Sequence, residues 1–188
     1  MSESPTEHFE HAEHAEHAAH SGDSFLSTVS VTIAILAVVA ATVGSFETIE
    51  SGTAISDKNE SVLLQNKAAD TWAFFQANSI KKNMYDIASA GAGTKADDYA
   101  AKARSYEVQQ SETRTEAEKL ERERDAKLEE SNHHEHRHHT LTVGVTLIHV
   151  AIAVATISII MRGRRWPWRA SMILGGIGTI IAAYAYVR

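Results

Sequence analysis

Three long apolar segments constrain this chain more than any other feature. They occupy residues 25–46, 140–161 and 168–188, and none of them contains Asp, Glu or Lys. A helix of about 20 residues, rising ~1.5 Å per residue, crosses the ~30 Å hydrocarbon layer of a bilayer. We therefore predict an all-α integral membrane protein with three transmembrane helices, in contact with the lipid bilayer.

The charged residues around these segments indicate an orientation. The tail at 1–24 contains six acidic residues and no Lys or Arg, whereas the short connection at 162–167 contains Arg162, Arg164 and Arg165. Short loops rich in Arg and Lys stay in the cytoplasm. We therefore expect loop 162–167 and the amino terminus to be cytoplasmic and residues 47–139 to lie on the other side.

Residues 47–139 are predicted to form a long extramembrane antiparallel helical hairpin of the coiled-coil type. They contain no proline, and a glycine-containing break at 91–95 divides them into two arms of 44 residues each. Gly52 and the polar residues near Ser56 could break the first arm close to the membrane. Residues with alternating spacings of three and four predict a packing seam on the second arm, at Ala103, Tyr106, Gln110, Thr113, Ala117 and Leu120. A comparable stripe is expected on the first arm, at Val62, Ala69, Trp72, Gln76, Ile80 and Ile87.

An aromatic group on the first arm covers more than one side of a helix. Its members are Trp72, Phe74 and Phe75. We expect part of this group to pack inside the hairpin and the remainder to form a docking patch for another copy or another protein, since aromatic side chains dominate interface energetics.

The first arm carries a family resemblance. It begins with Lys58-Asn59-Glu60 and continues with the pairs Trp72-Ala73 and Gln76-Ala77 and the run Ser79-Ile80-Lys81. In these features the chain resembles the bacterial membrane proteins grouped as domain of unknown function 4337, over residues 25–188. The resemblance implies the same architecture and a multi-pass protein of the bacterial inner membrane, but it implies no catalytic residue.

Two histidine-rich segments are candidate sites for a divalent metal such as Zn, Ni, Cu or Co. The chain has no cysteine, so histidine and carboxylate are the available ligands. The first segment carries His8, His11, His14, His17 and His20, and the second carries His133, His134, His136, His138 and His139. The alternatives are an acidic tail without a metal for the first segment and a protonatable interfacial segment for the second, which meets headgroups or an acidic helix.

Two further features lie within the apolar segments. His149 is an ionisable residue near the middle of the second span, where it is either a functional group or a neutral partner of a nearby hydroxyl. The last span carries small residues at intervals of four, at Ser171, Gly175, Thr179 and Ala183. Such a row predicts close helix–helix packing, either within the chain or between subunits.

These features favour a protein that is not an enzyme and that needs no cofactor. The sequence contains no phosphate-binding glycine loop, nucleophile elbow, metalloprotease motif or nucleic-acid footprint, and no small-molecule substrate is evident. The leading hypothesis is a scaffold or accessory subunit that forms a homo-oligomer or joins other membrane-protein subunits through its spans and hairpin. The alternatives are a metal sensor, buffer or delivery protein and a component of a channel or transporter.

Overall fold

The computed structural model describes residues 24–161 and 164–187, and these residues are helical apart from short connections. Helix α2 spans Ser24–Gly91, the short 3-10 helix η1 spans Gly93–Lys95, α3 spans Ala96–Ile160 and α4 spans Arg165–Tyr184. The prediction of an all-α chain with a helical hairpin is confirmed for these residues. The possible break near Gly52 is wrong, because α2 continues through it as regular helix.

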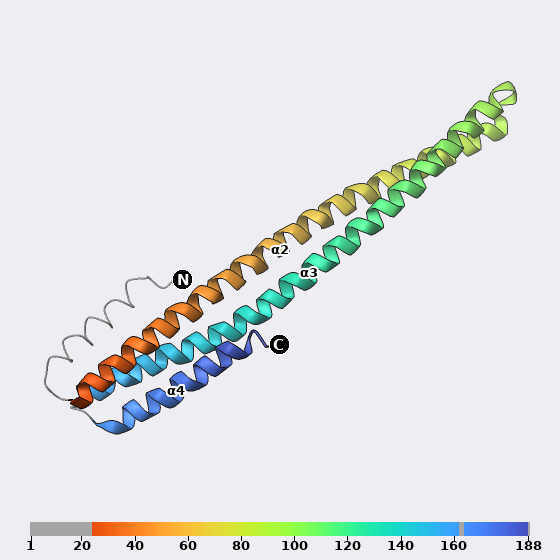
Figure 1. Ribbon diagram of the computed structural model, residues 1–188. Coiled ribbons are helices and arrows are strands. Elements are labelled where there is room, and N and C mark those ends of the chain that lie inside the picture. Colours follow the sequence, from red (N-terminus) through yellow and green to blue (C-terminus); the bar gives the residue numbers. More distant parts are fainter. Residues whose placement is uncertain (1–23, 162–163, 188) are drawn as a thin grey trace. The chain divides into compact units, whose positions relative to one another are not determined.

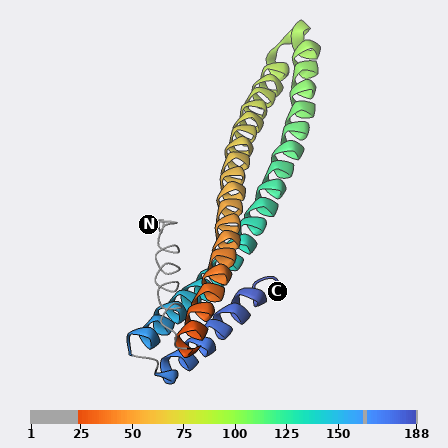
Figure 2. The ribbon, with the colours of Figure 1, turned by 60° about the vertical axis from the view of Figure 1, so that its left-hand side comes forward.

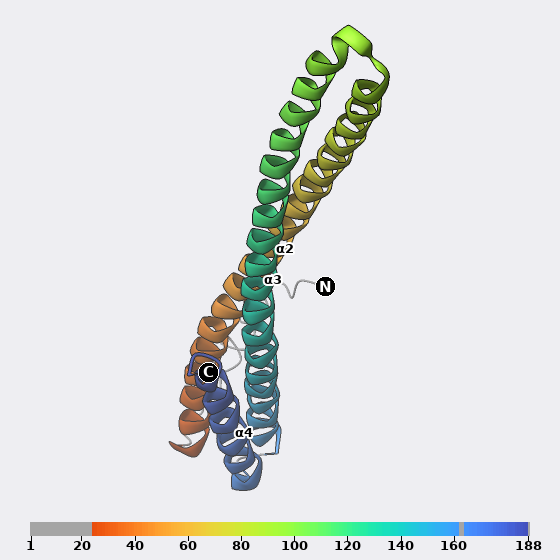
Figure 3. The same cartoon turned by 90° about the vertical axis from the view of Figure 1, so that its right-hand side faces the viewer.

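The chain divides into two compact units. A three-helix unit combines residues up to Thr53 with residues from His133 onward, and a hairpin unit comprises Ala54–Asn132. Within the first unit α4 lies beside α2 and α3 (Figure 1). The hairpin unit consists of the remainder of α2 and α3, which run side by side on either side of η1 (Figures 2 and 3).

The core of the three-helix unit consists of aliphatic and small side chains. On α2 its residues recur at intervals of three and four, which places them on one face of the helix: Val29, Ile33, Leu36, Ala40 and Val43. They meet residues of α3 and α4, including Leu141, Val145, Ile148, Ala151, Ala155 and Ala182.

Aromatic contacts at the two ends of α4 fix its direction. Near its start, Trp168 packs edge-on against Phe25 at 5.9 Å between ring centroids and donates to Thr32 Oγ1 at 3.1 Å. Just past its end, Tyr186 lies 5.8 Å from Phe46. Phe25 precedes Phe46 along α2, just as their partners Trp168 and Tyr186 follow one another in the chain. Helix α4 therefore runs parallel to α2 in this unit.

The hairpin turns where the sequence contains its glycine break. Gly93 has a φ of +53°, a left-handed conformation that costs glycine little and other residues more. Lys95 donates its backbone N–H to the carbonyl of Ala92 at 3.1 Å. The first turn of α3 contains Asp97 and Asp98, whose negative charges suit the positive end of the helix dipole.

The hairpin seam is small and polar. The seam predicted on the second arm lies on the side of α3 that packs in the hairpin, with Ala103 and Ala117 buried. The stripe predicted on the first arm is wrong in its phase, because Val62, Ile80 and Ile87 are all exposed. From residue 54 onward, the buried residues of this arm are Ala54, Asp57, Ser61, Ala68 and Asn78.

The length and composition of the helices bear on membrane insertion. Among the described residues, the helical stretches Ser24–Gly91 and Gly93–Ile160 each contain a window long and apolar enough to span a bilayer. Helix α4 has 20 residues and carries Arg165 and Arg169 in its first two turns. It does not meet the same test on its own.

Candidate functional site

A group of charged side chains lies at the end of the three-helix unit that is nearest to the hairpin in sequence. We call it the polar belt, and it consists of Glu47 and Glu50 on α2, His134, Arg137, His138 and Thr142 on α3, and Tyr186 after α4. The belt brings one part of the second histidine segment against two carboxylates. Its members come from α2, from α3 and from the segment that follows α4.

Glu50 is the centre of the belt. It is only 6% exposed, and its Oε2 atom lies 2.5 Å from Nδ1 of His134. Its other carboxylate oxygen lies 3.8 Å from the Arg137 guanidinium. The guanidinium carbon in turn lies 5.5 Å from the centre of the Tyr186 ring. A buried carboxylate thus has an imidazole and a guanidinium as partners on the neighbouring helix, which compensate for its burial.

Glu47 makes the second link, one helical turn before Glu50. Its Oε1 atom accepts a hydrogen bond from the Thr142 hydroxyl at 2.6 Å. The same oxygen lies 3.8 Å from Nδ1 of His138. The two glutamates therefore hold α3 at two successive turns.

Glu47 and Glu50 were not among the site residues predicted from the sequence. The available signal is their spacing, since 40, 43, 47 and 50 continue the intervals of three and four along the buried face of α2. Glu50 is buried and Glu47, one turn before it, is half-buried, and a buried acidic residue requires a polar or cationic partner. The imidazole and guanidinium partners are in the histidine segment at 133–139, which the sequence predicted as a candidate site.

The histidines of this segment are dispersed around α3. His134 and His138 point to the glutamates, whereas His133, His136 and His139 are exposed. Glu135 lies 3.8 Å from Nε2 of His139. In residues 24–161 and 164–187 no group of three or more His, Asp or Glu side chains is placed to share a metal ion. Metal binding by this segment stays a prediction, and His8, His11, His14, His17 and His20 lie outside the described residues.

A hollow of about 270 Å³ lies beside the belt. Its lining includes His133, His136, Arg137, Thr140 and Tyr184. These side chains offer guanidinium, imidazole and hydroxyl donors to an oxygen-rich group. In the neighbouring belt, the carboxylates face imidazole, guanidinium and hydroxyl groups. The hollow and the belt together are suited to binding or to a structural role.

The predicted row of small residues on α4 is divided between two faces. Ser171 and Gly175 are buried, whereas Thr179 and Ala183 are exposed. The buried row continues instead through Gly178, Ala182 and Ala185. His149 on α3 is partly buried.

Side-chain contacts also lock the hairpin unit. Trp72 Nε1 donates to Glu121 at 2.9 Å, and Ser131 donates to the carbonyl of Ala54 at 2.8 Å. Near the tip Tyr85 stacks on Tyr106 with 5.6 Å between ring centroids. Arg124 donates to Gln65. These contacts specify the pairing that the small seam residues would leave loosely defined.

Lys127 supplies the main cationic centre of this unit. Its ammonium lies 2.8 Å from Glu130, 3.5 Å from Asp57 and 3.6 Å from Glu60. The hydrogen bond to Glu130, with the nearby charges of Glu60 and Asp57, raises the pKa of Lys127 above its ordinary 10.5. A raised lysine pKa stabilises the fold at and below neutral pH, and this contribution is lost only as strong alkali deprotonates the folded state.

The aromatic patch is divided in the way that the sequence suggested. Trp72 and Phe75 are partly buried and pack edge-to-face at 5.3 Å between ring centroids, while Phe74 is 59% exposed. Phe74 therefore remains available for docking. Trp72 and Phe75 belong to the hairpin.

This division gives a first prediction. Trp72→Phe removes the donor to Glu121 and should lower the stability of the hairpin by about 1 kcal/mol, whereas Phe74→Ala should change it by less than about 0.5 kcal/mol. Hydrogen–deuterium exchange of residues 54–132 in the full-length protein measures both variants. Equal acceleration of exchange in the two variants would contradict the assignment of Phe74 to the outer surface.

A comparison with known protein families shows to which family this chain belongs. Residues 25–188 match the family described as "Domain of unknown function (DUF4337)". The chain belongs to the DUF4337 family. The match includes the three-helix unit from residue 25 onward and the whole hairpin unit. Comparison with curated proteins and with solved structures gave no match.

Proposed function

We propose that this DUF4337 protein is a non-enzymatic membrane scaffold, anchored by three transmembrane helices and carrying its helical hairpin outside the bilayer as an interaction arm. The observation that carries the proposal is the outer surface of the three-helix unit. Large aliphatic side chains from all three helices are exposed there: Val31, Ile35 and Val38 on α2, Val143, Val150 and Ile157 on α3, and Ile173, Ile177 and Ile180 on α4. Water is a poor solvent for such a surface, whereas lipid is a good one.

The interior of the same unit supports the proposal. Its close contacts are made by small residues, as in helix bundles within lipid. A Cβ atom added at Gly178 would lie 2.7 Å from the backbone oxygen of Gly144, so α3 and α4 approach closely there. The burial of Ser158 and Ser171 in the same interior places polar groups away from the aliphatic outer surface.

The proposal that α4 is the third span depends on the helices beside which it packs. Its basic start lowers its hydropathy, but its exposed isoleucines continue the aliphatic surface of α2 and α3. Arg165 lies over the Phe25 ring at 5.5 Å, and Trp166 is exposed beside it. Arginine and tryptophan at one end of a span are typical of a membrane boundary.

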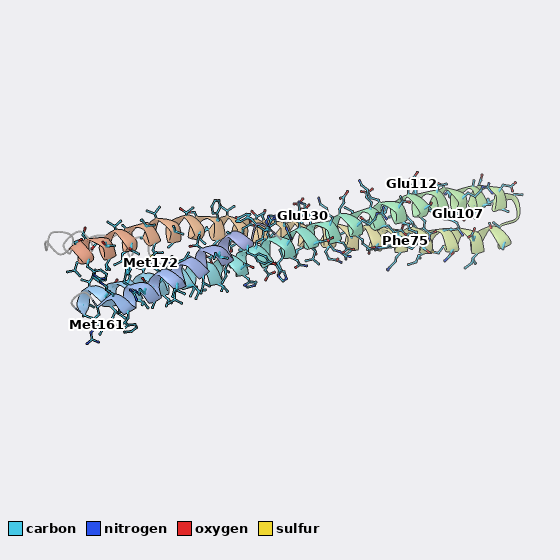
Figure 4. All side chains as sticks on the ribbon, turned by 60° about the horizontal axis from the view of Figure 1, so that its bottom comes forward. Phe75, Glu107, Glu112, Glu130, Met161 and Met172 are labelled. Atoms are coloured by element: carbon cyan, nitrogen blue, oxygen red, sulfur yellow. The ribbon has the colours of Figure 1, made fainter. Side chains whose placement is uncertain are left out.

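The polar belt is at the opposite end of these helices. We place the belt at the boundary between lipid and water, where Glu50 keeps its contacts with His134 and Arg137. The surface of the hairpin is strongly charged, with side chains such as Glu112 directed outward (Figure 4). We therefore place residues 47–139 outside the hydrocarbon, and the arginines near 164 on the cytoplasmic side.

The absence of cysteine makes topology directly testable, since any introduced cysteine is the only thiol in the chain. A membrane-impermeant maleimide should label Thr94→Cys at the hairpin tip in intact cells and Arg164→Cys only after permeabilisation. Ile177→Cys, which would face lipid, should be labelled only in detergent. Labelling of Thr94→Cys and Arg164→Cys from the same side would contradict three spans.

The scaffold role itself is tested by identifying the proteins that co-purify with this chain. Purification in a mild detergent should retain further copies or membrane partners, and loss of these contacts on altering the hairpin surface is the expected result. A turnover measured for the purified protein that depends on a belt residue would overturn the non-enzymatic proposal.

A further inference from the structure

The first arm of the hairpin has a second face whose side chains are exposed in the described part of the chain. Its apolar members are Ile55, Val62, Ala69, Ala73, Ile80 and Ile87, and all six are exposed. Asn59, Asn66, Gln76 and Asn83 lie between them and are also exposed. We call these ten residues the outer seam.

The spacing of the outer seam is that of a helix–helix interface. Its positions 55, 59, 62, 66, 69, 73, 76, 80, 83 and 87 alternate intervals of four and three without a skip. This repeat is the heptad pattern of a coiled coil, which keeps one face toward a partner helix over many turns. The buried positions 54, 57, 61, 68 and 78 occupy the other side of the same helix and face α3.

The absence of charge on this seam distinguishes it from a solvated surface. None of its ten residues is charged, although Lys58, Glu60, Lys67 and Asp70 alternate with them along the same helix. A face that only meets water gains nothing from excluding charge over about nine turns. The regular exclusion therefore points to contact with another helix.

The asparagines indicate which helix that is. In heptad notation the three-residue interval from 59 to 62 assigns Asn59 and Asn66 to position a and Val62 to position d. An asparagine at position a is tolerated in parallel two-stranded coiled coils, where it meets its own counterpart and fixes the register. Two such residues seven positions apart suit a partner with the same sequence.

Charges beside the seam agree with a parallel copy. In a parallel pair, a residue at position g faces the residue five positions further along the partner helix. Lys58 would then face the position of Leu63, Gln65 that of Asp70, and Asp86 that of Gly91. No two like charges would be opposed.

We propose that the outer seam is the interface between two copies of this chain, whose α2 arms pair in parallel and in register. The direction rests on the proposed function, because copies inserted into one membrane in one orientation present α2 in the same direction. The scaffold would thus be a dimer joined along its hairpins, with the seam of each hairpin and the seam between hairpins on opposite sides of α2.

Cysteine cross-linking in native membranes tests this pairing. Val62→Cys, at position d and far from the middle of the seam, should form a disulfide-linked dimer on mild oxidation. Lys67→Cys, an exposed position on the flank of the same helix, is the matched control and should remain monomeric. Equal yields for Val62→Cys and Lys67→Cys would overturn the proposal. A cross-link that forms only between Val62→Cys and Asn83→Cys chains would indicate an antiparallel pair and would overturn the proposed direction.

A charge placed in the seam supplies the second variant. Ile80→Glu in the Val62→Cys chain should reduce the dimer yield about tenfold or more, because two unpaired carboxylates would be buried together. Lys67→Glu in the same background should leave the yield unchanged. Since Ile80 is exposed within the single chain, Ile80→Glu does not disturb its core, and an unchanged yield would count against the seam.

The same samples separate this inference from the proposed function. Fractionation reports whether each variant is in the membrane, independently of cross-linking. Protein that is in the membrane without a Val62→Cys dimer would overturn the dimer alone. Protein that is found outside the membrane would overturn the anchor.

Discussion

Gly178→Ala is expected to destabilise the three-helix unit by roughly 1–3 kcal/mol, the cost of forcing extra volume into a closely packed interior. The added Cβ would meet Gly144 O at 2.7 Å, Ile148 Cγ1 at 2.9 Å and Leu147 Cβ at 3.1 Å. The nearest of these is a backbone atom, which cannot move without shifting α3. The two helices must therefore separate to accommodate one methyl group.

Gly176→Ala is the matched control for this variant. It lies two residues away on the same helix, and an added Cβ there meets nothing within 4 Å. Alanine also has the higher helix propensity by about 1 kcal/mol, so this variant should be as stable as the parent or more so. Thermal unfolding of both variants in the same detergent measures the difference, and equal midpoints would show that α3 and α4 are not in close contact.

Glu50→Ala is expected to cost about 2–3 kcal/mol by leaving His134 and Arg137 without their buried partner. Removal of one member of a fully buried ion pair costs about 3–5 kcal/mol. The expected loss is smaller here because the side chains of His134 and Arg137 are 27% and 28% exposed, compared with 7% for Glu50. Denaturant titration of the purified protein in detergent measures it.

Two controls test the assignment of this loss to the belt. Glu112→Ala, at an exposed position of the hairpin, should change the stability by less than about 0.5 kcal/mol. The double variant with Arg137→Ala should lose less than the sum of the two single losses, because the two residues interact. Additive losses would place the two residues in separate networks.

Gly178→Ala and Glu50→Ala test two different requirements of the three-helix unit, close packing and charged contacts. The glycine contact lets helices approach in the interior, where packing of small residues provides the attraction. The belt provides the charged contacts at the end of the unit. A chain that lacked either would retain its apolar surface but lose the fixed arrangement of α2, α3 and α4.

Much of the fold could be predicted from the sequence. The apolar segment at 25–46 lies within α2, and the segment at 140–161 lies within α3 except for Met161, which follows its end. The glycines at 91 and 93 flank the turn of the hairpin. The seam through Ala103 and Ala117 has the predicted phase. These features depend on local properties, namely hydrophobicity, backbone freedom and periodicity, which the sequence carries directly.

The candidate site was predictable only in part. The histidine segment at 133–139 was recognised from its composition, but its separation into belt histidines and exposed histidines depends on where α2 lies. Glu47 and Glu50 were not selected, because a glutamate beside an apolar segment is ordinarily solvated. Their role depends on neighbours about 90 positions away along the chain.

The sequence by itself determined that the first arm carries an apolar heptad stripe, that the hairpin turns at 91–95 and that apolar segments occupy the ends of the long helices. Only the tertiary structure decided which side of α2 faces α3. Hydrophobicity favoured the stripe with Val62 and Ile80, but the hairpin buries the one with Ala68 and Asn78. The physical reason is that small side chains allow α2 and α3 to approach closely and form specific polar contacts, which leaves the more apolar stripe exposed.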